Sequence, residues 1–148
     1  MPAVVADTHA AVWYLTNSPK LSPAAANALD QASAGGDPIL IPSISLVELT
    51  YLVEKGRVPA EARKRLVDAL AQPGGAYELA PLDGLVAAAV ELIDRSVVPD
   101  LPDRVIAATA LASGAALVSR DGKIRASQIQ TIWYGSPKLG PAARVKAK

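Results

Sequence analysis

Short apolar runs alternate along the chain with longer stretches in which apolar residues recur every three or four positions. The short runs are rich in Val, Ile and Leu and predict buried strands at 3–6, 39–41, 77–80, 116–119 and 129–133. The longer stretches predict helices at 8–17, 23–34, 45–55, 59–71, 84–95 and 102–113. Strands that alternate with helices favour an α/β fold, in which a mostly parallel sheet carries helices on both faces.

Proline, glycine and small polar residues mark the ends of these helices. Ser22 followed by Pro23 has the pattern of an N-cap and a first helical residue. Pro102 fixes its own φ and disfavours the α region for the residue before it, so we expect Leu101 to be the N-cap and Pro102 to begin the helix. Gly114 is placed to end that helix.

The helix that begins at Pro102 combines a buried body with a charged start. From Val105 to Ala112 its side chains are apolar or very small on nearly every face, which predicts a helix enclosed on most sides. Its first turn nevertheless carries Asp103, and Asp100 comes just before it. One explanation is that Asp103 complements the helix dipole, an effect of about 0.3–1 kcal/mol. The other is that the carboxylate serves a site.

Composition limits the kinds of chemistry that the chain can perform. Its 148 residues are enough for one domain with a real core, and the absence of Phe means that this core consists of Ala, Val, Leu and Ile. The absence of Cys excludes disulfides, thiolate zinc sites and cysteine nucleophiles. With a single His, a site built from several histidines is excluded as well.

The charge is balanced over most of the chain and basic only at its end. The formal net charge is +1, whereas no acidic residue follows Asp121. We therefore divide the chain into a domain over 1–134 and a basic, flexible tail over 135–148 that is able to touch polyanions. The longest apolar runs are far shorter than the ~20 residues of a membrane span, and the start lacks a signal-peptide pattern. These features predict a cytoplasmic protein with no membrane contact.

Four acidic residues lie next to the predicted strands. Asp7 follows the first strand, Glu48 lies in the helix after the second, Asp103 begins the helix before the fourth, and Asp121 follows the fourth. Open α/β sheets place their ligand sites beyond the carboxyl ends of the strands. We therefore expect these four acids to meet at one edge of the sheet.

Each acid also has a simpler structural explanation. Asp7 fits an N-cap, Ser45 and Glu48 have the spacing of a capping box, and Asp121 with Gly122 fits a turn. Together, however, carboxylates at one edge repel one another and raise each other's pKa values unless a cation neutralises them. A carboxylate site favours Mg²⁺, with Mn²⁺ as an alternative, over zinc. Such a site suits phosphodiester hydrolysis by an activated water.

Four segments occur in the order typical of one nuclease family: VVADT at 4–8, SISLVEL at 43–49, PDRVIAATA at 102–110 and LVSRD at 117–121. They resemble the PIN-domain ribonucleases, and within them the VapC toxins of bacterial toxin–antitoxin pairs. The resemblance covers about residues 3–133 and implies a sheet ordered 3-2-1-4-5. It also implies a homodimer restrained by a VapB-type antitoxin that covers the acidic groove.

The same resemblance assigns roles to the acids. Asp7 and Asp103 are implied to be the principal Mg²⁺ ligands, and Glu48 and Asp121 to complete the pocket by binding a second ion or positioning the attacking water. Asp100 is an accessory candidate, with a turn residue as the alternative.

Several other residues have two interpretations. Thr8 and Arg104 adjoin two of the acids and are accessory candidates, although local ion pairing is the simpler role for Arg104. His9 is a candidate for contacting substrate, with a half-exposed helix histidine as the alternative. Arg120 is a candidate for contacting phosphate, with an ion-pair partner of the adjacent acid as the alternative. Trp13 and Tyr14 have the spacing of packing residues rather than base-stacking platforms. A basic cluster is a candidate for binding the RNA backbone, with a solvated helix face as its alternative: Lys55, Arg57, Arg63, Lys64 and Arg65.

The sequence therefore predicts a Mg²⁺-dependent endoribonuclease that cleaves structured cellular RNA, such as transfer or ribosomal RNA, and acts as the toxin of a type II toxin–antitoxin pair. The rival is a module of the same fold that binds RNA or protein without catalysis. An aspartyl phosphatase is disfavoured, because Asp7-Thr8-His9 lacks a second Asp two residues after the first.

Overall fold

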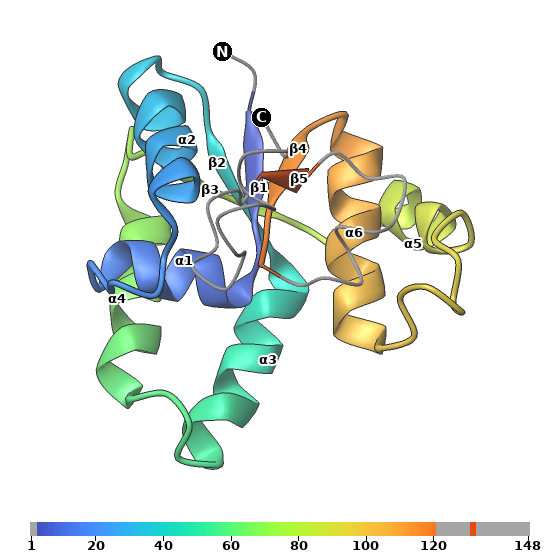
Figure 1. Cartoon of the computed structure of the whole chain (residues 1–148), viewed down its shortest axis with the longest axis horizontal. Coiled ribbons are helices and arrows are strands. Elements are labelled where there is room, and N and C mark those ends of the chain that lie inside the picture. The colour runs from blue at the N-terminus through green and yellow to red at the C-terminus, as the bar shows by residue number, and fades with distance from the viewer. Residues whose placement is uncertain (1–2, 121–130, 133–148) are drawn as a thin grey trace, which may run out of the picture.

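A five-stranded parallel sheet forms the centre of the chain (Figure 1). The computed structural model describes residues 3–120 and 131–132. The strands lie in the order β3-β2-β1-β4-β5, which confirms the order that the family resemblance implies. Their bounds are β1 (Val4–Ala6), β2 (Ile39–Pro42), β3 (Tyr77–Ala80), β4 (Ala116–Val118) and β5 (Thr131–Ile132).

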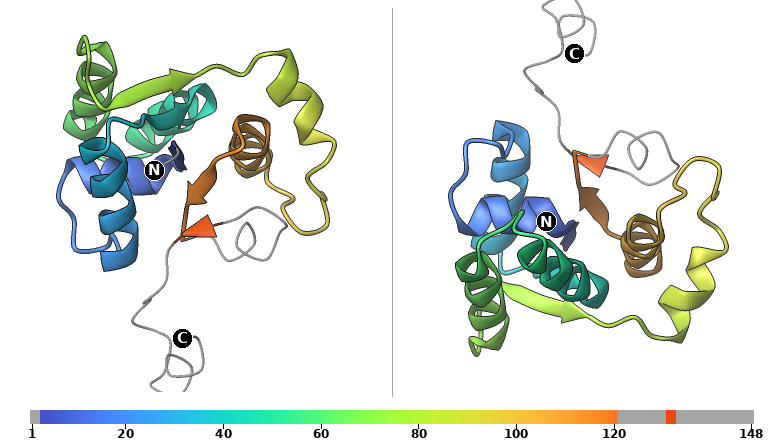
Figure 2. Two further views of the ribbon diagram at one scale, coloured as in Figure 1. Left: turned by 90° about the horizontal axis from the view of Figure 1, so that it is seen from above. Right: turned by 90° about the horizontal axis from the view of Figure 1, so that it is seen from below.

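Helices cover both faces of this sheet, as predicted (Figures 1 and 2). Their bounds are α1 (Thr8–Leu15), α2 (Pro23–Ala34), α3 (Ser43–Glu54), α4 (Ala60–Ala71), α5 (Gly84–Val90) and α6 (Leu101–Ser113). Because strand side chains alternate between faces, Val4 and Ala6 pack into a core with α1 to α4, whereas Val5 packs into a second core with α5 and α6. The two cores fix the sheet between two helical layers.

The start of α6 differs by one residue from the prediction. Asp100, not Leu101, is the N-cap, and its Oδ2 accepts a 3.2 Å hydrogen bond from the backbone N–H of Asp103. Leu101 is already helical, and Pro102 is tolerated after it because the first N–H groups of a helix have no intrahelical partner. Aspartate is a far better N-cap than leucine, and this preference decides the boundary.

The start of α3 is also earlier than predicted, and the capping box is not formed. The helix begins at Ser43, directly after Pro42, so Ser45 lies inside it rather than at its N-cap. The Ser45 hydroxyl is buried and has no hydrogen-bond partner within the described part of the chain. The side chain of Glu48 is consequently not tied to a cap.

The helix α5 ends at Val90, short of the predicted end at Arg95. The chain turns at Asp94, whose carboxylate accepts hydrogen bonds from the backbone and the hydroxyl of Ser96. These bonds hold the pKa of Asp94 below its ordinary value. A local side-chain turn thus replaces the last helical turn.

Some predictions fall outside the described residues. They concern Asp121 and the basic tail at 135–148, so the proposed domain boundary stays a prediction. Across residues 3–120 and 131–132, no helix has both the length and the apolar character needed to cross a bilayer.

Candidate active site

Acidic side chains from three separate parts of the chain line one pocket of about 440 Å³. They are Asp7, which directly follows β1, Glu48 on α3, and Asp100 and Asp103 at the start of α6. The pocket lies at the carboxyl edge of the sheet, where β1 and β4 end. This is the edge at which the sequence predicts the acids to meet, and Asp121 is the one member that lies outside the described residues.

Asp7 is held rigidly from both sides. Its backbone N–H donates to the carbonyl of Val118 at the end of β4, and its Oδ1 accepts a 2.8 Å hydrogen bond from the N–H of Ala10. The expected N-cap role is therefore present, and it coexists with a position in the pocket. The cap bond fixes the direction of the carboxylate.

Burial raises the pKa of the Asp7 carboxyl above its ordinary value, and the nearby charge of Glu48 adds to the rise. Hydrogen bonds from Ser119 and Ala10, together with the charge of His9, lower it again. Keeping the Asp7 carboxylate charged therefore costs free energy in the folded protein. A cation beside it would remove much of this cost.

Glu48 is positioned by Thr8. The buried Thr8 hydroxyl donates a 2.7 Å hydrogen bond to Oε1 of Glu48, which connects the first turn of α1 with α3. Thr8, an accessory candidate from sequence, therefore reaches the pocket and holds one of its acids.

Asp103 enters the pocket from the first turn of α6. The cap bond from its N–H to Asp100 sets the direction of this turn, so both acids are placed by one helix start. Behind them α6 is buried from Val105 to Ala110, as its composition predicts. The deep packing of the helix anchors the acidic end at the pocket.

Sequence reasoning assigned no role to Ser119, although its side chain hydrogen-bonds the Asp7 carboxyl. Ser119 is fully buried and follows the last residue of β4, directly beside Asp7 across the sheet. The sequence feature that could have identified Ser119 is a small polar residue at the end of a buried strand that neighbours β1.

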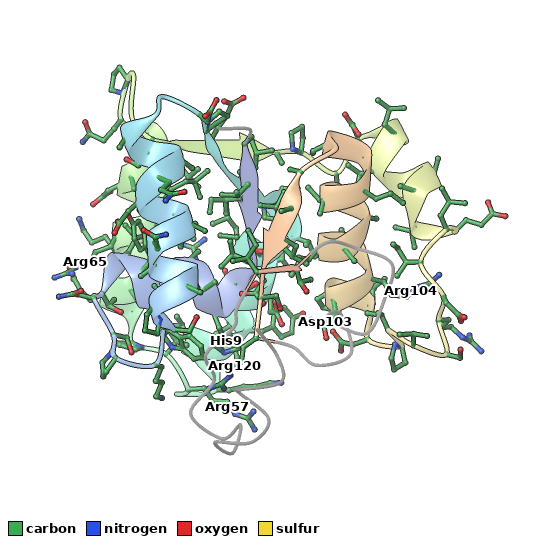
Figure 3. All side chains as sticks on the ribbon, turned by 45° about the horizontal axis from the view of Figure 1, so that its top comes forward. His9, Arg57, Arg65, Asp103, Arg104 and Arg120 are labelled. Carbon is green, nitrogen blue, oxygen red and sulfur yellow. The ribbon has the colours of Figure 1, made fainter. Side chains whose placement is uncertain are left out.

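Cationic and aromatic groups form one wall of the pocket. His9, Trp13 and Arg120 line it, and the Arg120 guanidinium lies 4.8 Å from the centre of the Trp13 ring. The rings of His9 and Trp13 are 5.3 Å apart and tilted by 42°. Figure 3 shows His9 and Arg120 close together near the carboxyl edge of the sheet.

Arg104 lies elsewhere, on the side of α6 that faces α5 (Figure 3). Its Nη2 donates to the carbonyl oxygens of Val90 at 2.9 Å and Ile93 at 2.7 Å. Arg104 is not among the described residues that line the pocket. Arg104 therefore has a structural role rather than the accessory role in the site. Its guanidinium hydrogen-bonds backbone carbonyls that have no intrahelical partner where α5 ends.

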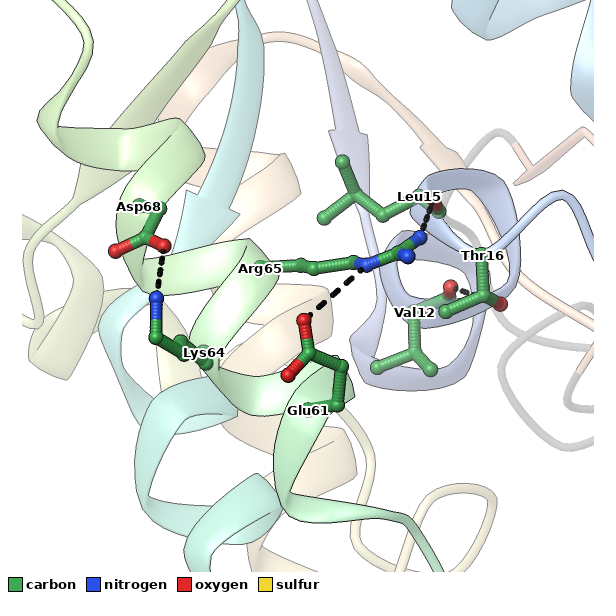
Figure 4. Close-up of polar contacts among 7 residues, drawn as sticks. All are labelled: Val12, Leu15, Thr16, Glu61, Lys64, Arg65 and Asp68. Atoms are coloured by element: carbon green, nitrogen blue, oxygen red, sulfur yellow. Dashed lines mark hydrogen bonds and ion pairs between the residues drawn. The ribbon is translucent and has the colours of Figure 1, made fainter.

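The basic residues predicted to bind RNA do not form one rim at the pocket. Arg63 donates to the hydroxyl of Thr50 on α3, while Arg65 contacts Glu61 and the carbonyl of Leu15 at the end of α1 (Figure 4). Lys64 pairs with Asp68 on α4 itself. Consecutive helical residues point in directions about 100° apart, which explains this divergence. Figure 3 shows Arg57 and Arg65 well apart.

The carboxylates of the pocket suit a hard divalent cation such as Mg²⁺. Carboxylates are the side chains that Mg²⁺ prefers, and one or two of them suffice because the ion keeps waters and substrate phosphates as its other ligands. Asp7 and Asp103 provide two such groups. Within the described part of the chain, no three acidic or histidine side chains converge as a complete ligand cluster. Two carboxylates in one pocket fit an ion whose remaining ligands are waters and substrate phosphates.

Comparison with known proteins shows the family of this chain. The model of the PIN domain matches residues 4–128, which is most of the chain. The chain belongs to the PIN-domain family. A curated relative, Ribonuclease VapC22 of Mycobacterium tuberculosis, is 29% identical over 136 residues and is matched over 90% of this chain and all of its own length.

Solved structures share this fold. One is VapBC2 from Rickettsia felis bound to a DNA fragment from its promoter, with 20% identity, a TM-score of 0.65, and coverage of 87% of this chain and 96% of that one. Another is FitAcB from Neisseria gonorrhoeae, with 22% identity, a TM-score of 0.56, and coverage of 86% and 95%. The predicted resemblance to VapC-type PIN-domain proteins is thus confirmed.

Proposed function

We propose that this PIN-domain protein is a divalent-metal-dependent endoribonuclease and the toxin of a type II toxin–antitoxin pair. The observation that carries the proposal is that Asp7, Glu48 and Asp103, which come from three separate elements, line one pocket at the carboxyl edge of the sheet. The likeness to a protein named Ribonuclease VapC22 supports RNA as the substrate. Structured cellular RNA, such as transfer or ribosomal RNA, is the proposed class.

The protein groups have distinct tasks in this reaction. Asp7 and Asp103 would hold Mg²⁺ or Mn²⁺, and Asp121 would complete the set. When bound, the cation supplies electrophilic stabilisation of the phosphodiester and acidifies a water molecule. Glu48, oriented by the Thr8 hydroxyl, would accept a proton from the attacking water. Arg120, which lines the pocket, would bind a phosphate of the RNA.

A protein partner would control this activity. The likeness to VapBC2 supports a VapB-type antitoxin as this partner. We propose that the antitoxin covers the acidic pocket. A homodimer is also proposed, and exposed leucines on α5 and after its end, Leu85 and Leu92, offer an apolar surface for it. The basic residues of α4 stay candidates for RNA contacts away from the pocket.

The experiment incubates purified protein with total cellular RNA and maps new 5′ ends by sequencing. Wild type is compared with Asp103→Asn, each with Mg²⁺ and with EDTA. Discrete cuts that require both the metal and Asp103 support the proposal and identify the RNA. If folded, antitoxin-free protein makes no cut in any condition, the non-catalytic binding module becomes the better account.

A further inference from the structure

Arg120 is the one arginine or lysine among the described residues that line the acidic pocket. It shares the pocket with the carboxylates of Asp7, Glu48, Asp100 and Asp103. Arginine readily forms bidentate pairs with carboxylates, so a guanidinium in such a pocket is expected to take one of them as its partner. Within residues 3–120 and 131–132, however, no carboxylate is ion-paired with Arg120. Another contact therefore competes with the carboxylates for this side chain.

The competing contact is with the ring of Trp13. The guanidinium carbon of Arg120 lies 4.8 Å from the centre of that ring. This distance is inside the range of about 6 Å over which an aromatic ring attracts a cation, and tryptophan attracts a cation more strongly than tyrosine or phenylalanine does. Arginine also stacks well on aromatic faces, because its guanidinium is planar and weakly hydrated. The guanidinium therefore lies on the aromatic wall of the pocket and not on a described carboxylate.

The Trp13 ring is held in place by the helix that begins at Asp7. His9 lies one turn before Trp13 on α1, and the two rings are 5.3 Å apart and tilted by 42°. The first turn of α1 is fixed by its N-cap, in which Oδ1 of Asp7 accepts a 2.8 Å hydrogen bond from the N–H of Ala10. The aromatic wall and the Asp7 carboxylate thus belong to one helix, which fixes their relative positions.

The backbone of Arg120 lies close to the acids. Asp7 donates its backbone N–H to the carbonyl of Val118 at 3.1 Å, and Arg120 is two residues beyond Val118. The Arg120 side chain is long and exposed, and it lines the same pocket as the acids, so a change of rotamer brings its guanidinium to a carboxylate. The contact with Trp13 decides between these two positions of the guanidinium.

We infer that Trp13 is a positioning residue, which keeps the Arg120 guanidinium away from the carboxylates of the acidic pocket. The inference rests on the proposed nuclease function, in which Asp7 and Asp103 hold a divalent cation and Arg120 binds an RNA phosphate. An Arg120 side chain released from the ring pairs with these carboxylates and competes with the divalent cation for them. With the ring in place, the carboxylates stay available to the cation and the guanidinium stays available to the phosphate.

The test measures binding of Mn²⁺ to the whole protein without RNA, by the loss of the electron paramagnetic resonance signal of free Mn²⁺. Trp13→Leu is expected to weaken Mn²⁺ binding by about two- to fivefold, the factor that corresponds to one cation–π contact at an exposed site. Trp13→Phe keeps an aromatic face and should bind Mn²⁺ almost as well as wild type. In an Arg120→Gln background, Trp13→Leu should have no effect, because the competing cation is absent.

Lys20→Gln is the matched control. Lys20 Nζ lies 5.9 Å from the centre of the same ring, but Lys20 is not among the described residues that line the acidic pocket. Its removal should leave Mn²⁺ affinity unchanged. A second readout leaves Trp13 intact: in Trp133→Phe, Trp13 is the only tryptophan of the chain. Adding Arg120→Gln to that variant should change the intensity of Trp13 fluorescence, because the charge over the ring is lost.

The outcomes distinguish this inference from the nuclease itself. Equal Mn²⁺ affinity in Trp13→Leu and wild type overturns the positioning role, even where metal-dependent cleavage of RNA occurs. An equal loss of affinity in the Arg120→Gln background overturns it too, because the ring would then act through the fold. If Trp13→Leu does not fold, the fluorescence decides, and an unchanged intensity refutes the contact. If Mn²⁺ affinities follow the prediction but no condition gives cleavage, the positioning role stands and the nuclease proposal fails.

Discussion

The hydroxyl of Thr8 donates a 2.7 Å hydrogen bond to Oε1 of Glu48, and this contact joins two residues that are 40 positions apart in the sequence. It links the turn that follows β1 to the helix that follows β2. The orientation of Glu48 in the pocket therefore depends on the first turn of α1.

Thr8→Val tests the dependence, because it keeps the shape of the side chain and removes the donor. Loss of a hydrogen bond to a charged group costs about 1.5–3 kcal/mol when its acceptor stays buried, and less here because Glu48 is partly exposed. We expect RNA cleavage at least tenfold slower at saturating substrate, measured as kcat, while Thr8→Ser retains activity. Equal kcat in Thr8→Val and wild type would show that Glu48 needs no positioning.

Asp7→Asn should separate stability from activity. Asparagine also serves as an N-cap, and it has no charge whose burial must be compensated, whereas burial raises the pKa of Asp7. In EDTA we expect Asp7→Asn to unfold in urea at the same or a higher concentration than wild type, and Asp7→Ala to be less stable by about 1 kcal/mol. A large loss of stability in Asp7→Asn would contradict this account of the carboxylate.

Arg104→Met is expected to destabilise the fold without altering catalysis. The variant removes both hydrogen bonds to the carbonyls of Val90 and Ile93, so the free energy of unfolding should fall by about 2 kcal/mol. At a temperature where the variant is fully folded, kcat/KM should equal the wild-type value. A fall in kcat/KM in the folded variant would instead show that Arg104 contributes to the active site.

Tyr14→Phe should reveal a stabilising contact that is lost at alkaline pH. Burial raises the pKa of the Tyr14 phenol above its ordinary value, and the hydrogen bond to Asp30 raises it further. The neutral phenol therefore contributes stability that is complete below the unfolded pKa and is lost as pH rises through the folded one. We expect a loss of about 1 kcal/mol in the variant at pH 8. Urea unfolding should show this difference shrinking above pH 10, and a constant difference would be inconsistent with the contact.

The sequence predicted the architecture well because the fold follows from strong local patterns. Each described strand overlaps a predicted apolar run, and the family motifs implied the observed strand order. The position of three acids at one edge then followed from the rule that parallel strands end together.

Residue-level errors arose where two local rules competed. Pro102 indicated a cap at Leu101, but the better capping side chain of Asp100 decided the boundary. Ser45 and Glu48 had the spacing of a capping box, but the helix begins earlier and Thr8 holds Glu48 instead. The partners of Arg104 lie on α5 and just beyond it, and no local pattern indicates contacts between distant elements.

The most direct test of the central claim measures single-turnover cleavage of a synthetic RNA that carries a mapped cut site. Wild type, Asp7→Asn, Asp103→Asn and the exposed control Arg95→Gln are compared while Mg²⁺ is titrated from zero. The account predicts Mg²⁺-dependent cleavage by wild type and Arg95→Gln, and at least a thousandfold slower cleavage by both pocket variants at every concentration. Cleavage at the wild-type rate by folded Asp7→Asn or Asp103→Asn would show that the acidic pocket is not the active site.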